Sequence, residues 1–313
     1  MDLSIIVPCY NEEAALPIFY DEVTRVMRED LPALTYELVL VNDGSRDGTL
    51  EAMRRLAAGD EHVRYISFSR NFGKEAGMYA GLCNAAGDLT AIMDADMQDP
   101  PALLPQMVEL LRSEEIDCVA TRRQDREGEP PVRSWFARQF YRLINRISEV
   151  EIVDGARDFR LMKRPMVDAL VRMGEYNRFS KGLFAWVGFR THWLSYKNVE
   201  RVAGETKWSF WGLFKYAIEG IMNFSQAPLL IASWGGIFMT LFAMFMVVFL
   251  VVRKLVFGDP VQGWASLACI IVFVAGLQLF GIGILGQYLA KTYMETKHRP
   301  QYIIAESNKD DAK

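Results

Sequence analysis

The stretch Ala91-Ile92-Met93-Asp94-Ala95-Asp96-Met97-Gln98-Asp99 is an apolar run that ends in two carboxylates one residue apart. Such a run predicts a buried strand that gives way to a loop at Asp94. Side chains two residues apart in an extended segment share a face, so Asp94 and Asp96 can converge on one cation. Such oxygen ligands suit Mg²⁺ or Mn²⁺, which proteins hold with one or two carboxylates plus substrate phosphates. Taken alone, the pair is explained equally well by a solvated acidic turn.

A strand followed by a polar loop recurs along residues 1–122. Apolar runs predict strands at Leu3–Tyr10, Tyr36–Asn42, Val63–Phe68, Leu89–Asp94 and Asp117–Thr121. Helical patterns lie between them at Ala15–Glu29, Gly48–Ala57, Lys74–Ala85 and Pro101–Arg112. Strands that alternate with helices indicate a parallel sheet with helices on both faces. The sequence therefore predicts an α/β fold.

Polar clusters follow four of these predicted strands. They are Tyr10–Glu13, Asn42–Ser45, Ser69–Lys74 and Asp94–Asp96. Ligands of such sheets bind outside the carboxyl ends of the strands. We therefore expect the active site at the edge of the sheet where these four strand ends lie, which we call the rim.

Composition narrows the classes of function. The net charge of −4 over 313 residues gives no global basic field, so nucleic acid is not an expected partner. The four cysteines are scattered, without metal-ligand spacing, and fit a reducing compartment without a disulfide framework. The N-terminus begins with a strand-like run, and we expect no cleaved signal peptide.

Two long segments carry no charged residue: Gly220–Val252 and Pro260–Ala290. Each exceeds the roughly 20 apolar residues that cross a bilayer. The connector Arg253–Asp259 is short, so the segments predict an antiparallel transmembrane hairpin with both chain ends on one side. A buried helical pair in a soluble core is the alternative. The charge count near the spans hardly decides orientation. Because the N-terminal domain shows no export signal, we place it in the cytoplasm and expect a multi-pass protein of the cytoplasmic (inner) membrane.

Two further segments are expected at the bilayer surface. Val132–Ile147 reads as a basic amphipathic helix, which commonly lies in the membrane interface, although a surface helix packed on the core is the alternative. Trp208–Tyr216 is rich in the aromatic residues that favour the headgroup level. We predict a catalytic domain at residues 1–207 with an interfacial helix at 132–148. An interfacial segment at 208–227, a hairpin at 228–290 with spans at 228–252 and 264–290, and a cytoplasmic tail at 291–313 complete the prediction.

Six motifs in order resemble family 2 glycosyltransferases with a GT-A fold. The resemblance is to the polyprenyl-phosphate glycosyltransferase branch, which includes bactoprenol glucosyltransferases and dolichol-phosphate mannose synthases. With the hairpin, it covers nearly the whole chain, and the order and spacing of the motifs make it specific. The motifs are Val7–Glu13, Val41–Thr49, Arg70–Ala76, Asp94–Pro101, Asp158–Met162 and Gly204–Ser209.

The resemblance implies a nucleotide-sugar donor and Mg²⁺ or Mn²⁺ as cofactor. Asp96 is expected to bind the metal and Gln98 to be a third ligand, while Asp94 serves the metal, the ribose or the sugar. The loop 71–74 offers backbone N–H groups at a helix start, where anions are favoured, with the Lys74 cation nearby. The remaining donor-binding candidates are Pro8, Tyr10, Glu12, Asp43 and Gly73. An ordinary Asp-Gly turn would also explain Asp43.

A lipid phosphate acceptor needs cations between the rim and the membrane. Arginine suits bidentate phosphate recognition, and solvated surface charge is the alternative for each candidate. The candidates are Arg122, Arg126, Arg133, Arg201 and Lys207. A phosphate monoester has a second pKa of about 6, so this acceptor is largely ionised at neutral pH and needs no strong general base.

By family analogy, Asp158 faces the acceptor. We assign it as an orienting or sugar-binding carboxylate with a base function left open. The family usually has Gly where this chain has Arg157, an acidic residue where it has Lys163, and Ser where it has Thr206. We expect Arg157 and Lys163 to add positive charge near the acceptor.

The resemblance implies inverting, metal-dependent transfer of a hexose to undecaprenyl phosphate at the cytoplasmic leaflet. Glucose from UDP-glucose is the preferred donor, and GDP-mannose, UDP-N-acetylglucosamine and a UDP-aminoarabinose derivative are the alternatives. A non-catalytic membrane scaffold that retains the nucleotide fold is a further alternative. The small residues Gly276, Gly281, Gly283 and Gly286 suit either a homo-oligomer or packing within the hairpin.

Overall fold

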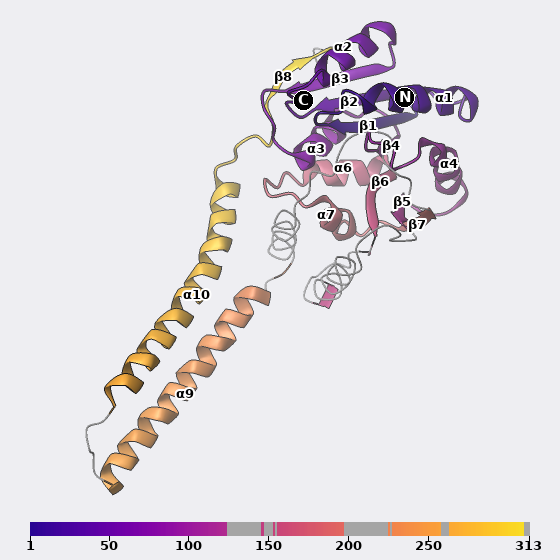
Figure 1. Cartoon of the computed structure of the whole chain (residues 1–313). Coiled ribbons are helices and arrows are strands. Elements are labelled where there is room, and N and C mark those ends of the chain that lie inside the picture. Colours follow the sequence, from indigo (N-terminus) through magenta and orange to yellow (C-terminus); the bar gives the residue numbers. More distant parts are fainter. Residues whose placement is uncertain are drawn as a thin grey trace.

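The computed structural model describes residues 1–123, 145–146, 153, 155–196, 225, 227–257 and 263–309. Within these residues an α/β domain carries a long helical hairpin, and the last strand returns from the hairpin to the domain (Figure 1). The α/β fold expected from the sequence is confirmed.

The predicted elements of residues 1–122 are all present, with ends within two residues of the prediction. The strands are β1 (Leu3–Cys9), β2 (Tyr36–Asn42), β3 (Val63–Phe68), β4 (Leu89–Ile92), β5 (Cys118–Arg123), β6 (Ala156–Lys163), β7 (Thr191–Tyr196) and β8 (Ile304–Ser307). The helices of the domain are α1 (Ala15–Glu29), α2 (Thr49–Gly59), α3 (Lys74–Asn84), the 3₁₀ turn η1 (Pro101–Leu103), α4 (Leu104–Ser113), α6 (Arg164–Arg172) and α7 (Ser180–Trp186). The strands and helices after β5 were not among the predicted elements of the domain.

The sheet is mixed, with strand order β7-β5-β6-β4-β1-β2-β3-β8. The pairs β1–β2, β1–β4, β2–β3 and β5–β7 are parallel. Strand β6 lies between β4 and β5 and runs antiparallel to both. The beginning of β6 therefore meets the carboxyl ends of the parallel strands, and residues that start β6 reach the rim.

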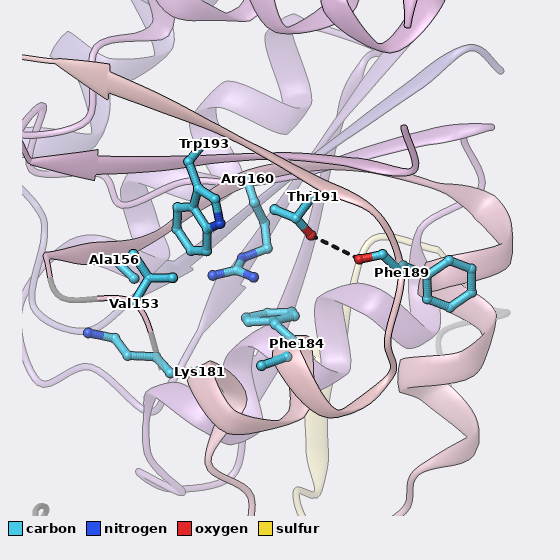
Figure 2. Close-up of a pocket in the computed structure, with 9 residues that line it drawn as sticks. Val153, Ala156, Arg160, Lys181, Phe184, Phe189, Thr191 and Trp193 are labelled. Carbon is cyan, nitrogen blue, oxygen red and sulfur yellow. Dashed lines mark hydrogen bonds between the residues drawn. The ribbon is translucent and has the colours of Figure 1, made fainter. Parts of the chain in front are cut away.

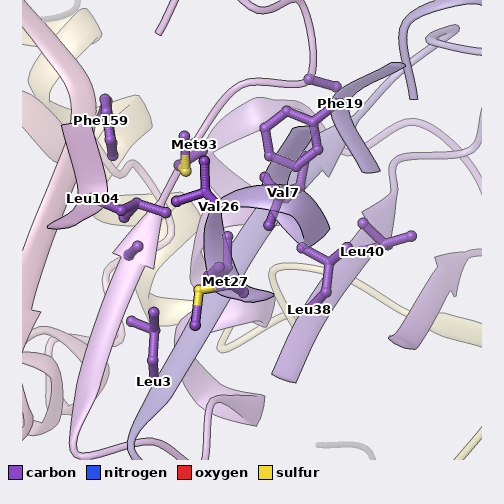
Figure 3. Packing of buried hydrophobic residues seen from close by; sticks show 14 of the residues in the cluster. Leu3, Val7, Phe19, Val26, Met27, Leu38, Leu40, Met93, Leu104 and Phe159 are labelled. Atoms are coloured by element: carbon purple, nitrogen blue, oxygen red, sulfur yellow. The ribbon is translucent and has the colours of Figure 1, made fainter. Parts of the chain in front are cut away.

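Helices cover both faces of the sheet, as the alternation of strands and helices predicts. On one face, α1, α2 and α4 cover the sheet, with α2 on β2 and β3 and α4 on β5 and β6. Phe19 and Met27 of α1 are buried in the same cluster as Leu38 and Leu40 of β2 (Figure 3). On the other face, α3, α6 and α7 bury a second cluster that includes Met78. A hydrophobic core thus packs against each face of the sheet, and the polar side chains lie at its rim.

The apolar segments form two helices, α9 (Ala227–Phe257) and α10 (Trp264–Thr296), which run side by side (Figure 1). Both are long and apolar enough to cross a membrane, and the most apolar parts are not buried against the protein. Helix α9 continues to Phe257, so residues 253–257, expected in the connector, are helical. Residues 253–257 contain no glycine or proline, and the next glycine, Gly258, follows the end of the helix.

The C-terminal segment returns to the domain as β8, which pairs antiparallel with β3. Arg54 Nε donates to Glu306 at 2.8 Å, and the Tyr65 hydroxyl donates to the same carboxylate at 2.6 Å. The ring of Tyr302 stacks on Phe68 at 5.0 Å between centroids. Residues 302–308 are therefore part of the folded domain, although the sequence predicts them in the tail.

The predicted interfacial helix at 132–148 lies outside the described residues except for 145 and 146, which are helical. The predicted interfacial segment at 208–227 lies outside them except for Ser225 and Ala227. Both assignments stay predictions.

Candidate functional site

The register between β4 and β6 brings Asp94 and Asp158 together. Ile92 pairs with Arg160 across these antiparallel strands. Asp94 lies two residues after Ile92, just beyond β4, and Asp158 lies two residues before Arg160 on β6. Because the two strands are antiparallel, Asp94 and Asp158 lie level with each other at the rim. Two motifs that are far apart in the sequence meet in this way.

Lys74, the first residue of α3, bridges the two carboxylates. Its Nζ lies 2.7 Å from Oδ1 and 2.9 Å from Oδ2 of Asp94, and 2.5 Å from Oδ2 of Asp158. Burial would lower the pKa of Lys74, but the charges of Asp158 and Asp94 outweigh it and raise that pKa above its ordinary value. Lys74 is therefore a fixed cation at the rim.

Asp158 stays ionised at neutral pH. Burial would raise the pKa of its carboxyl group, but the charges of Lys74 and Lys181 and the hydrogen bond from Lys74 hold that pKa well below the usual range. A carboxylate with such a low pKa is a weak acceptor for a proton. This suits the expected orienting role of Asp158 better than a role as general base.

The turn after β4 presents Asp96 and Gln98. Asp96 is buried, and its Oδ1 accepts a hydrogen bond from the Gln98 backbone N–H at 3.1 Å. Met97 between them has φ of 61°, a left-handed conformation that is costly for a residue with a side chain. Such local strain is typical of functional sites, where the backbone aims particular side chains.

The donor set of this turn fits a divalent cation that shares its coordination with a substrate. Asp96, Asp94 and Gln98 supply hard oxygen atoms at alternate positions of one turn, which suits Mg²⁺ or Mn²⁺. Among the described residues, no three His, Cys, Asp or Glu side chains converge as a metal cluster. Lys74 also contacts both oxygens of Asp94. Asp96 would therefore be the main protein ligand, and phosphate oxygens would have to supply others.

Arg157 does not lie with Asp158. Successive residues of a strand point to opposite faces, and Arg157 Nε donates to Oδ1 of buried Asp99 at 3.0 Å, while its Nη2 donates to Gln98 Oε1 at 3.4 Å. The Tyr196 hydroxyl donates to the same Asp99 oxygen. Arg157 therefore neutralises the buried Asp99 beside the turn that carries Gln98, and its expected contribution to the acceptor site stays a prediction.

Lys163 lies at the opposite end of β6 from Asp158. It pairs with Leu89, the first residue of β4. The rim lies at the other end of this strand pair, where β4 ends and β6 begins. The expectation that Lys163 adds charge near the acceptor is therefore wrong.

Asp43, a donor-binding candidate, organises the loop before α3. Its Oδ1 accepts a hydrogen bond from the Phe72 N–H at 2.6 Å and its Oδ2 from the Gly73 N–H at 2.9 Å. Burial raises the pKa of Asp43, although these two hydrogen bonds oppose the rise. Two of the loop N–H groups that were expected to bind an anion are thus taken by Asp43, which holds Lys74 in place through this loop.

The first-strand candidates line the same edge. Pro8 packs on α3 so closely that a Cβ on Gly77 would lie 3.3 Å from its Cβ atom. Glu12 N donates to Thr49 Oγ1 at 2.9 Å, which ties the loop after β1 to the start of α2. Tyr10, between them in sequence, is partly buried. Their assignment to the nucleoside stays a prediction.

Of the acceptor candidates, only Arg122 lies within the described residues. It is exposed near the end of β5, and its Nε donates to Ser195 Oγ of β7 at 2.9 Å. The others, Arg126, Arg133, Arg201 and Lys207, lie outside the described residues.

The structure adds two cations that are not among the site residues predicted from the sequence. Arg160 and Lys181 line a pocket beside Asp158, together with Phe184 and Trp193 (Figure 2). Arg160 belongs to the motif Asp158–Met162, so the sequence could have indicated it as a site residue. No pattern marks Lys181, because only the packing of α7 brings it to β6.

Comparison with known proteins agrees with the motifs. The sequence model of "Glycosyl transferase family 2" matches residues 4–171. A prophage bactoprenol glucosyl transferase homolog of Escherichia coli K12 is 41% identical, over 97% of this chain and 98% of its own length. The SfII prophage-derived bactoprenol glucosyl transferase of Shigella flexneri is 40% identical over 99% of both chains.

Among solved structures, the chain is similar to glucosyl-3-phosphoglycerate synthase of Mycobacterium tuberculosis. The identity is 18%, the TM-score 0.47, and the match covers 71% of this chain and 77% of that one. The resemblance found in the motifs is confirmed by the family match and by the full-length relatives. The chain belongs to glycosyl transferase family 2, and it is a glycosyltransferase.

Proposed function

We propose that the enzyme transfers glucose from UDP-glucose to undecaprenyl phosphate at the cytoplasmic face of the inner membrane, with inversion and with the help of a divalent cation. The names of full-length relatives at 40–41% identity support the sugar and the lipid carrier. The single observation that carries the chemistry is the Lys74 bridge between Asp94 and Asp158 at the rim.

The bridge sets the geometry of transfer. Asp94 belongs to the turn after β4, which would bind the donor diphosphate, and Asp158 belongs to β6, which would face the acceptor. The Lys74 ammonium group contacts both carboxylates and holds them together. The groups that would align the donor and the acceptor are therefore coupled to each other. Alignment of two bound reactants lowers the barrier without any covalent step on the protein.

The protonation states agree with an already ionised nucleophile. The second pKa of a phosphate monoester is about 6, so the acceptor carries its negative charge at neutral pH. Asp158, whose pKa is held low by Lys74, does not need to take a proton from it. Asp158 would orient a sugar hydroxyl or the acceptor, and Lys74 would offset the negative charge that gathers at the rim.

Asp96 would hold the cation, with Asp94 and Gln98 beside it. The cation, when bound, would neutralise charge on the leaving diphosphate. Removal of divalent cations with a chelator is expected to stop transfer, and added Mn²⁺ or Mg²⁺ is expected to restore it. Transfer that survives complete chelation would contradict this part of the proposal.

The hairpin would hold the rim at the membrane surface. In the last turn of α10, the Glu295 carboxylate accepts hydrogen bonds from the backbone N–H groups of Tyr176 at 3.0 Å and Asn177 at 3.1 Å. The Tyr288 hydroxyl donates to the Ser225 carbonyl at 2.6 Å, which joins α10 to the start of α9. The apolar helices are thereby fixed to the loop that precedes α7, near the site.

A donor screen tests the proposal. The purified full chain, in detergent with undecaprenyl phosphate and Mn²⁺, is given radiolabelled UDP-glucose, GDP-mannose, UDP-N-acetylglucosamine or a UDP-aminoarabinose derivative in turn. We expect label to enter the organic phase from UDP-glucose. Label from another donor alone would replace the sugar assignment, and no label from any donor would favour a scaffold.

A further inference from the structure

A pocket of about 370 Å³ opens between β6, β7 and α7. Its lining includes Arg160, Lys181, Phe184, Phe189, Thr191 and Trp193. Pockets that hold small molecules begin at about this size. None of these residues was among the acceptor candidates chosen from the sequence.

Two cations and several aromatic rings share this pocket. The guanidinium carbon of Arg160 lies 3.4 Å from the centre of the Phe184 ring, and Figure 2 shows it between Phe184 and Trp193. Arg160 is buried, and burial lowers its pKa. Lys181 enters from the first turn of α7. Such a lining suits a ligand that joins an anionic group to an apolar chain.

The pocket adjoins Asp158 on the side of the sheet away from Arg157. Arg160 Nε donates to the Asp158 carbonyl at 3.4 Å and Nη2 donates to the Arg157 carbonyl at 3.1 Å, so its head is fixed by backbone. The charge of Lys181 also helps to lower the pKa of Asp158. An anion in the pocket would therefore lie close to the group that the rim uses for alignment.

A buried contact fixes Lys181 relative to Lys74. The Glu75 carboxylate accepts hydrogen bonds from the Ser180 backbone N–H at 3.1 and 3.2 Å and from its hydroxyl group. Glu75 follows Lys74 in α3, and Ser180 precedes Lys181 in α7. The helix that carries one cation of the site is therefore held by the residue next to the other cation.

We propose that this pocket binds the phosphate group and the first isoprenoid units of the acceptor, with Lys181 contacting the phosphate and Phe184 and Trp193 contacting the chain. The proposal rests on the proposed function, because it takes the acceptor to be a lipid phosphate. It places donor and acceptor on opposite sides of Asp158: the diphosphate at the turn 94–98, the lipid phosphate between β6, β7 and α7. Arg160 is a positioning residue: its guanidinium group holds the ring of Phe184 in place and adds positive charge to the pocket.

Lys181→Gln tests the phosphate contact. Loss of a charge-assisted contact to phosphate is expected to raise the KM for undecaprenyl phosphate about tenfold or more, while the KM for the nucleotide sugar stays within about twofold. Lys163→Gln, at the far end of β6, is the matched control and is expected to leave both KM values unchanged. An unchanged KM for the lipid in Lys181→Gln would overturn the assignment, and so would an equal rise for the donor.

Competition experiments test the chain contact. Geranyl phosphate is expected to inhibit the wild-type enzyme more strongly than inorganic phosphate, and Trp193→Ala is expected to remove most of that difference. If Trp193→Ala keeps the full preference for geranyl phosphate, the chain does not lie in this pocket. If inorganic phosphate competes as well as geranyl phosphate in the wild type, the pocket recognises phosphate alone and the proposal is wrong.

The failure of this inference is separable from the failure of the proposed function. If the wild type transfers glucose to undecaprenyl phosphate and Lys181→Gln does so with the same KM, only the pocket assignment fails. If the wild type transfers no sugar to this lipid, the function itself fails.

Discussion

Asp94, just beyond the end of β4, lies level with Asp158 of β6, and the Lys74 ammonium group is within 2.9 Å of both carboxylates. Two acids this close would repel each other without the lysine. The arrangement joins the loop after β3, the end of β4 and the start of β6 into one unit. We expect the chemistry of the enzyme to depend on this unit more than on any single proton transfer.

Lys74→Gln is expected to lower transfer at pH 7 about 100-fold, because misplaced reactive groups cost rates of that order. The pKa of Asp158 should rise in the variant, since burial would no longer be offset by Lys74. In the wild type, the depressed pKa contributes stability above the unfolded value of about 3.9, and this stability is lost as the pH falls through the folded value. Asp158 should contribute less of this acid-sensitive stability in the variant, so acidification should lower the melting temperature less than in the wild type. Wild-type activity with an unshifted pH profile would contradict this role of Lys74.

Arg157→Gly is expected to lower the free energy of unfolding by about 3 kcal/mol, because it leaves the buried Asp99 carboxylate without its cation. Burial raises the pKa of Asp99 even in the wild type, and the loss of Arg157 should raise it further. A raised acid pKa means that the folded state binds more protons than the unfolded one, so stability should fall as the pH rises through that range.

Asp99→Asn in the Arg157→Gly background is the matched control for this pair. It removes the unpaired charge and is expected to recover part of the lost stability in denaturant melts. Additive losses from the two substitutions would show that they do not interact.

Gly81→Ala is expected to destabilise the domain by about 1–3 kcal/mol through overpacking. A Cβ at this position of α3 would lie 2.1 Å from Ile6 Cγ2 of the central strand β1. Gly59→Ala is the control, because a Cβ there meets nothing within 4 Å. Equal melting temperatures for the two variants would show that α3 can move away from β1 at little cost.

Deletion of residues 300–313 is expected to lower the melting temperature by several degrees and to promote aggregation. It removes β8 and the contacts of Glu306 and Tyr302, and it exposes the edge of β3. Deletion of residues 310–313 alone, beyond the strand, is the control and should leave the melting temperature unchanged. If the longer deletion melts like the full chain, β8 contributes nothing to the domain.

Much of the fold follows from local pattern. Apolar runs and helical periodicity predict the elements up to β5, because each one buries a face that its own sequence marks. Strand β6 was noticed only as a motif, since its place between β4 and β5 depends on pairing across a long separation in the chain. Strand β8 has four residues and one apolar side chain of any size, Ile304, so no periodicity marks it.

The sequence predicts which residues belong to the site but not which of them contact one another. The motifs identify Asp94, Lys74 and Asp158, but only the antiparallel register of β6 shows that one lysine joins both acids. The side of β6 on which Arg157 lies also follows from that register. Lys181 becomes visible only when α7 packs against β6, which no local pattern encodes.

The most direct test of the account is glucose transfer by Asp158→Asn. The purified variant is compared with the wild type for transfer from radiolabelled UDP-glucose to undecaprenyl phosphate, and for UDP-glucose binding in the same preparation. We expect the variant to bind UDP-glucose with wild-type affinity and to transfer at least about 100-fold more slowly, because the amide cannot form the ion pair with Lys74. Transfer at the wild-type rate would contradict the central claim that the Asp94–Lys74–Asp158 unit aligns donor and acceptor.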